Sequence, residues 1–201
     1  NRIMHNPEFQ KLEGAWRGLH YMVNNTESDV HLKIRVMDIS KQELGKNLKR
    51  FKGAAWDQSP MFKKIYEEEY GQFGGEPFGA LVGDYHFDQS PPDVELLGEM
   101  AKISASAHAP FITGASPSLM QMQSWQELAN PRDLAKIFST PEYAGWRSLR
   151  ELNDTSFDLI ITLSPEARQH LTRLEAFTAT IGTAKQPKQM GKPGISFDTS
   201  A

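Results

Sequence analysis

The stretch FGALVGDYHFDQSPPDVELLGEMAKISASAHAPFITGA, residues 78–115, determines the fold class. Its first six residues, 78–83, are a short apolar run after a glycine-rich loop and predict a buried strand. Residues 91–107 repeat apolar side chains at helical spacing, and residues 110–115 predict another strand. A helix between two strands predicts an α/β fold with a mostly parallel sheet.

Two further strands are expected outside this stretch. Leu32, Ile34 and Val36 recur at every second position, which is the period of a strand whose faces differ in burial. Residues 157–163 form another apolar run. We therefore expect a sheet of about four strands, flanked by helices.

A polar residue followed by proline predicts where several helices start, because proline lacks an N–H that would be unpaired in the first turn. The pairs are Asn6–Pro7, Ser59–Pro60, Ser90–Pro91, Ser116–Pro117, Asn130–Pro131, Thr140–Pro141 and Ser164–Pro165. After the first pair, apolar side chains form one helical stripe, which we expect to be buried. The stripe consists of Phe9, Leu12, Trp16, Leu19 and Val23.

The remaining helices follow from caps and apolar spacing. Ser40 and Glu43 form a capping box for a helix that we expect to bury Leu44, Leu48 and Phe51. Further helices are expected at residues 60–70 and 165–181, and three short helices at 124–152 should form a helical cap. Residues 183–201 lack an apolar face and should be a disordered tail.

Composition excludes several classes of function. The 201 residues carry 22 basic and 25 acidic side chains, a balance that disfavours nucleic acid and anionic membrane as partners. There is no cysteine, which excludes disulfides, thiolate zinc sites and thiol nucleophiles. No apolar run approaches the roughly 18 residues of a membrane span. We expect a cytoplasmic protein and, since no initiator methionine is present, a fragment of a longer chain.

A metal site is conceivable after the strand at 78–83. Asp84, His86 and Asp88 alternate there, and Asp93 or His108 could complete a ligand set of imidazole and carboxylates. Three polar residues that leave a strand are more often a solvated strand end. We favour that interpretation and predict no catalytic, cofactor-binding or metal-binding residue.

Two other patterns resemble catalytic or phosphate sites only superficially. Gly71, Gly74, Gly75 and Gly79 precede a strand, whereas phosphate loops follow one, so a turn with positive φ is the better interpretation. Ser164 follows a strand, but it lacks the small neighbours of a nucleophile elbow, and a helix cap is favoured.

Charged and aromatic side chains could mark interfaces. Glu67, Glu68 and Glu69 form an acidic triplet and residues 41–52 a basic helix, although each is more often a solvated face. Large aromatics often anchor interfaces. Of the four tryptophans we expect one or two at a subunit contact and the others in the core; they are Trp16, Trp56, Trp125 and Trp146.

A collinear series of motifs resembles the large subunit of the type VI secretion contractile sheath, the TssC/VipB/EvpB/ImpC family. It comprises HNPEFQKLEGAWRGLH (5–20), LKIRV (32–36), DQSP (57–60), FKKIYEEEYG (62–71), FGGEP (73–77), HAPF (108–111), NPRDL (130–134) and EYAGWRSLR (142–150). The resemblance covers about three quarters of the chain and ends after Glu151. It gives an expected division into a sheath-like domain at 1–151, an unmatched extension at 152–182 and the tail.

The resemblance implies a cytoplasmic structural protein that catalyses nothing and needs no cofactor. Its implied partners are a small sheath subunit of the TssB/VipA type, other copies of itself, an inner-tube Hcp-type protein and a recycling ClpV-type ATPase. Because the residues after Glu151 do not resemble the family, the chain could be a fragment, a fusion, a frameshifted gene product or a divergent relative. The alternative is a small α/β hydrolase or metal-dependent enzyme centred on Asp84, His86 and His108.

Overall fold

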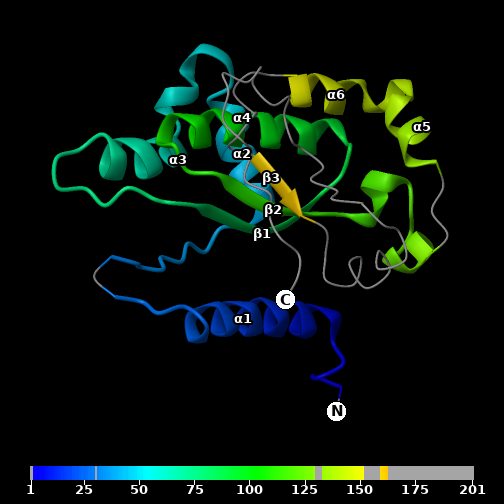
Figure 1. Cartoon of the computed structure of the whole chain (residues 1–201), viewed down its shortest axis with the longest axis horizontal. Helices are drawn as coiled ribbons and strands as arrows, with labels where there is room; N and C mark the ends of the chain where they lie inside the picture. Colours follow the sequence, from blue (N-terminus) through cyan, green and yellow to red (C-terminus); the bar gives the residue numbers. More distant parts are fainter. Residues whose placement is uncertain (1, 30, 130–132, 152–158, 163–201) are drawn as a thin grey trace, which may run out of the picture. The chain divides into compact units, whose positions relative to one another are not determined.

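The computed structural model describes residues 2–29, 31–129, 133–151 and 159–162. The chain divides into two compact units, Asn1–Ser40 and Lys41–Ala201, each described by itself. Figure 1 shows the elements of both units. Within the described residues, no helix is long and apolar enough to cross a membrane.

The first unit consists of one helix and an extended segment. Helix α1, Pro7–Asn24, starts as predicted: the Asn6 side chain accepts a hydrogen bond from the Glu8 N–H (2.9 Å), and proline occupies the first turn. The helix ends at Asn25, whose N–H donates to the Tyr21 carbonyl (3.0 Å). After it, Asp29 Oδ1 accepts hydrogen bonds from the N–H groups of the residues two and three positions on, which forms a turn.

The strand expected at residues 32–36 is absent. Residues 31–40 adopt neither helix nor strand, and Leu32 and Val36 are exposed. A strand is defined by backbone hydrogen bonds to a neighbour, and the described part of this chain pairs no strand with the segment. The prediction was therefore wrong, because alternation in sequence does not supply the neighbour.

The second unit contains a parallel sheet of three described strands. β1 (Leu81–Phe87), β2 (Phe111–Ala115) and β3 (Leu159–Thr162) lie in the order β1-β2-β3, and both pairings are parallel. The α/β prediction with a parallel sheet is thus confirmed. The described sheet has three strands and not about four, because residues 32–36 do not join it.

Strand β1 differs from the prediction in place and in burial. It runs from Leu81 to Phe87, and its even-numbered side chains are exposed, so it is not the continuous buried run expected at 78–83. Pairing with β2 sets these bounds: the Leu81 N–H donates to the Pro110 carbonyl (2.9 Å), and the Phe87 carbonyl accepts from the Ser116 N–H (2.8 Å). Asp84 and His86 therefore lie within the strand and not beyond its end.

Helices flank the sheet, and four of them begin where a polar residue precedes proline, at Pro60, Pro91, Pro117 and Pro141. The helices are α2 (Lys41–Arg50), η1 (Gly53–Gln58), α3 (Pro60–Phe62), η2 (Lys63–Tyr70), α4 (Pro91–Ala107), η3 (Pro117–Met120), η4 (Trp125–Ala129), α5 (Leu134–Ser139), η5 (Pro141–Tyr143) and α6 (Ala144–Glu151). The expected helix at 60–70 is present, with η2 as a π-helix. The expected helix at 165–181 and tail at 183–201 lie outside the described residues, and the division at 151 and 182 stays a prediction.

Helix α4 forms the centre of the core. It contacts all three strands, and α2, η2 and α6 pack against it. Leu97, Met100 and Ile103 are buried, as their spacing predicted. In the helical cap the Tyr143 hydroxyl donates to the Leu119 carbonyl (2.9 Å), so this buried ring keeps its polar end paired.

Candidate functional site

The apolar stripe of α1 is exposed in the described chain. No residue of α1 is buried, and the exposed fractions reach 58% for Leu12 and 64% for Trp16. Val23 is also exposed, while Phe9 and Leu19 are half-buried. That this stripe is buried against something therefore stays a prediction, since the structure holds no partner chain. Burial of each large side chain against another protein would contribute about 1.5–3 kcal/mol.

The extended segment after α1 has the composition of a strand without strand structure. Residues 32–36 alternate three aliphatic side chains with Lys33 and Arg35, and the backbone here forms no strand ladder in the described residues. Such a segment is suited to add a strand to the sheet of another protein. Together with the stripe of α1 it makes the first unit a candidate interface.

The structure separates the residues of the hypothetical metal site. Asp84 and His86 are exposed on the same face of β1, and His86 lies level with Gly114 near the carboxyl end of β2. His108 instead caps the end of α4 in a left-handed conformation (φ 51°), before β2 begins. Its ring centroid is 5.5 Å from that of Tyr70. The two histidines therefore lie at opposite ends of the parallel strands.

Asp88 and Asp93 take part in a structural network. Asp88 Oδ1 accepts from the Ser90 N–H (2.8 Å), and the Asp88 N–H donates to Asp93 Oδ2 (2.9 Å). Lys41 Nζ donates to the same Asp93 oxygen and to the His86 carbonyl, both at 2.7 Å. Burial opposes ionisation of Asp88, but hydrogen bonds from Ser90 and the charge of Lys41 outweigh it and lower the pKa of Asp88.

This network accounts for the carboxylates that the metal hypothesis required. Across the described ranges, no group of three or more histidine, aspartate or glutamate side chains could hold a metal ion. Lys41 was missed by sequence reasoning, since nothing in the sequence links it to Asp93. Ser164, considered as a nucleophile, lies outside the described residues.

The glycine-rich loop forms the turn that was predicted. Gly74 has a φ of +83°, a conformation that side chains disfavour. A Cβ on Gly75 would overlap the Glu69 carbonyl oxygen, so this position also excludes larger residues. Between these constraints the loop presents Phe73, whose ring is fully exposed. Sequence reasoning missed Phe73, although an aromatic residue inside a predicted turn was a usable signal.

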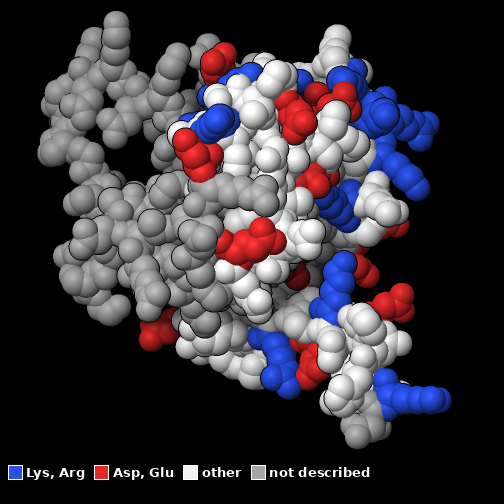
Figure 2. Space-filling model, turned by 90° about the vertical axis from the view of Figure 1, so that its right-hand side faces the viewer, with Lys and Arg blue, Asp and Glu red and all other residues white. Residues whose placement is uncertain are grey.

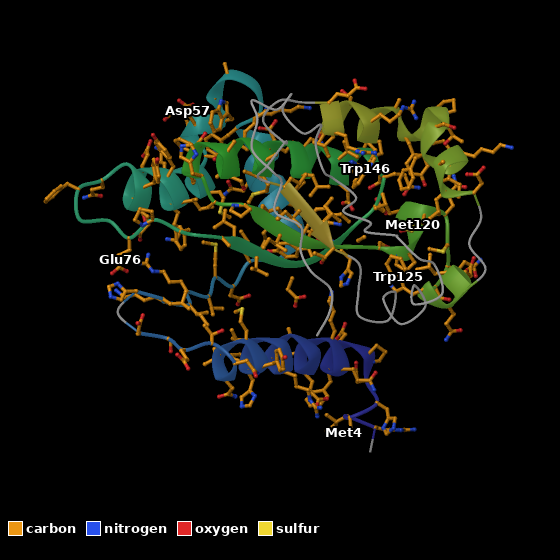
Figure 3. The ribbon with its side chains drawn as sticks, viewed as in Figure 1. Met4, Asp57, Glu76, Met120, Trp125 and Trp146 are labelled. Atoms are coloured by element: carbon orange, nitrogen blue, oxygen red, sulfur yellow. The ribbon has the colours of Figure 1, made fainter. Side chains whose placement is uncertain are left out.

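The four tryptophans divide between core and surface. Trp125 and Trp146 are buried, and Figure 3 shows Trp146 on α6 and Trp125 in the cap. Trp56 is half-buried, with its ring 5.0 Å from that of Phe62. Trp16 is exposed on α1. The structure thus indicates Trp16 as the tryptophan available for a subunit contact.

Charged residues are mainly solvated, as predicted. Glu67 and Glu68 are exposed, whereas Glu69 accepts a hydrogen bond from the Glu76 N–H (2.9 Å). At the end of α2, Lys52 pairs with Glu95 (2.7 Å), which raises the pKa of Lys52 and lowers that of Glu95. In Figure 2 basic side chains gather near the right-hand edge of the view, and acidic ones are spread over it.

Comparison with known proteins identifies the family. The family model described as VipB, "EvpB/VC_A0108, tail sheath N-terminal domain", matches residues 1–172. The type VI secretion system sheath protein TssC1 of Pseudomonas aeruginosa (strain PAO1) is 75% identical over 157 residues, or 78% of this chain. The chain spans about a third (32%) of the length of that relative. The chain therefore belongs to the large-subunit family of the type VI secretion sheath, a family of structural proteins.

Proposed function

We propose that this chain is a structural piece of the type VI secretion contractile sheath that pairs with the small sheath subunit. The pair would polymerise with further copies around an inner tube of Hcp-type protein, in the cytoplasm. A ClpV-type ATPase would recycle the contracted sheath. In this proposal the chain promotes no reaction, and its function lies in contacts between proteins.

The exposed stripe of α1 is the observation that carries the pairing. Leu12 and Trp16 lie on one face of an 18-residue helix in which no residue is buried. Large aromatic side chains contribute a disproportionate share of interface energy when a partner buries them. A solvated helix would not gain stability from a regular apolar face, whereas an interface helix would.

The extended segment supports the same proposal in a second way. Residues 32–36 follow α1 after the turn at Asp29 and keep the alternation of a half-buried strand. Pairing with a sheet of the small subunit would satisfy the backbone and place alternate side chains on each face. Helix and strand would then dock as one module.

A co-purification experiment tests the pairing. The chain is co-expressed with a tagged small sheath subunit, and the amount of chain retained is measured for the unchanged sequence and for the double variant Leu12→Glu, Trp16→Glu. We expect the double variant to retain at least about tenfold less, because two charges would have to be buried in an apolar contact. The matched control is Gln10→Glu, which adds a charge on the opposite side of α1 and should bind normally.

Self-association gives an independent measurement. Without a partner, the exposed stripe should make the chain associate with itself, so size-exclusion chromatography should show a mass that rises with concentration. The double variant should shift this equilibrium toward monomer. Equal retention of the double variant and the unchanged chain by the small subunit would exclude the stripe as the pairing surface.

A further inference from the structure

Phe73 is the most exposed large apolar side chain among the described residues. Its exposed fraction is 105%, the value of a side chain that its neighbours in the loop leave fully open. Exposed single apolar residues are common and need no explanation. Phe73 differs because the surrounding backbone is held in one conformation.

The turn that carries Phe73 is closed by a backbone hydrogen bond. The Gly75 N–H donates to the Gln72 carbonyl at 3.1 Å, which makes Phe73 and Gly74 the two central residues. Gly74 supplies the positive φ, +83°, that a type II turn needs at its third position. Phe73 therefore occupies the outer corner of the turn.

The end of η2 anchors this turn. The Gly71 N–H donates to the Tyr66 carbonyl (2.7 Å), and the Glu76 N–H donates to Glu69 Oε2 (2.9 Å). Gly75 lies so close to the Glu69 carbonyl that only glycine fits. The loop is thus tied to the helix on both sides of Phe73, and Figure 3 shows Glu76 on it. A ring held in this way loses little freedom on binding, which favours affinity.

The charges around Phe73 indicate the chemistry of a partner. Glu67 and Glu68 are exposed at the end of η2, and Glu76 is exposed after the turn. An exposed apolar ring within the acidic stretch 67–76 is complementary to a surface that carries lysine and arginine. This chain itself offers exposed basic residues on α2 and at the start of η2. They are Lys46, Lys49, Arg50, Lys63 and Lys64.

We propose that Phe73 docks on a second copy of this chain, on the basic surface formed by α2 and the start of η2. α2 packs against α3, which leads directly into η2, so these basic residues belong to neighbouring elements. The contact joins two different surfaces, and such head-to-tail contacts can generate open helical polymers. The choice of a second copy as the occupant rests on the proposed sheath function.

Photo-crosslinking from position 73 tests this contact. Phe73 is replaced by p-benzoylphenylalanine in the chain co-expressed with the small subunit, and the irradiated complex is analysed by gel electrophoresis and mass spectrometry. We expect a species of twice the chain mass, with the crosslink in residues 41–64 of the second copy. A crosslink to the small subunit alone, or none, would overturn the proposal.

Substitutions separate this inference from the pairing. Without any crosslinking, Phe73→Ser should reduce the amount of polymer that sediments by at least about fivefold. Gln72→Ser, in the same turn, should leave this amount unchanged. Lys46→Glu with Lys49→Glu should lower the crosslink yield by a similar factor. All these variants should still retain the small subunit, so loss of polymer with intact pairing counts for the inference. If Phe73→Ser forms as much polymer as the unchanged chain, the Phe73 contact is refuted. If the unchanged chain itself does not bind the small subunit, the proposed function is refuted instead.

Discussion

Helices α1 and α4 are alike in sequence pattern and opposite in burial. They have 18 and 17 residues, both start at a polar residue followed by proline, and both carry regular apolar spacing. α4 has buried residues from its first turn to its last, whereas α1 has none. Periodicity therefore establishes that a helix has an apolar face, but it does not tell which protein covers that face.

The two tryptophans of these regions give the largest expected contrast. Trp146 is 2% exposed where α6 packs on α4, so Trp146→Ala should lower the free energy of unfolding by about 3–5 kcal/mol. Trp16→Ala removes a side chain that is 64% exposed and should change the free energy of unfolding by less than about 0.5 kcal/mol. Urea unfolding followed by circular dichroism measures both.

The result also bears on the interface assignment. If Trp16→Ala destabilises the isolated chain as much as Trp146→Ala, then α1 is covered within its own chain and the contrast is lost. A small stability effect with a large loss of small-subunit binding would sharpen it.

A smaller effect is expected where the second unit begins. Lys41 is its first residue and bridges Asp93 and the His86 carbonyl, with its Nζ 4.3 Å from the centre of the Phe87 ring. Lys41→Met leaves the buried Asp93 without its cation and should cost about 2 kcal/mol.

The matched control is Lys52→Met, which removes an exposed pair with Glu95 and should change stability much less than Lys41→Met, because solvent screens the pair. Thermal unfolding of both variants compares them. Equal destabilisation would mean that the Lys41 network contributes no more than a surface ion pair.

The smallest effect is a pH dependence at Asp88. Its pKa is lower in the folded chain than in the unfolded chain, so its charge stabilises the fold above the unfolded pKa of about 3.9. This contribution is lost as the pH falls through the lower folded pKa. Asp88→Asn should therefore cost less than about 1 kcal/mol at pH 7, because partial exposure screens the charge.

Unfolding of this variant from pH 7 to pH 2.5 provides the measurement. The difference from the unchanged chain should shrink below about pH 4 and disappear when Asp88 is protonated in both states. A difference that stays constant over this range would show that the charge of Asp88 has no part in stability.

Local signals predicted the helices because their causes are local. Pro91 after Ser90 marks the start of α4, and the apolar spacing to Ile103 marks its buried face; both are confirmed. Strands were less predictable because each needs a partner. Residues 32–36 alternate but form no strand in the described part of the chain, and β1 is placed by its register with β2 rather than by its own composition.

The candidate interface was only half visible in the sequence. The stripe containing Trp16 was recognised, but periodicity alone does not tell whether such a face is exposed. Asp84 and His86 share a face as alternation requires, while His108 is carried away from them by the length of α4. The Lys41–Asp93 contact joins α2 to α4, and such long-range pairs leave no local pattern.

The third strand has a consequence for the order of folding. β1 and β2 are joined through α4 alone, whereas β3 joins β2 only after the intervening cap, from Ala115 to Leu159. Closing the longer loop costs more chain entropy, so we expect the strand–helix–strand unit to form early and β3 to dock late. Until β3 docks, the edge of β2 stays free and can pair with the strand of another nascent chain. The risk of misassembly is therefore greatest when many chains are synthesised rapidly at high concentration.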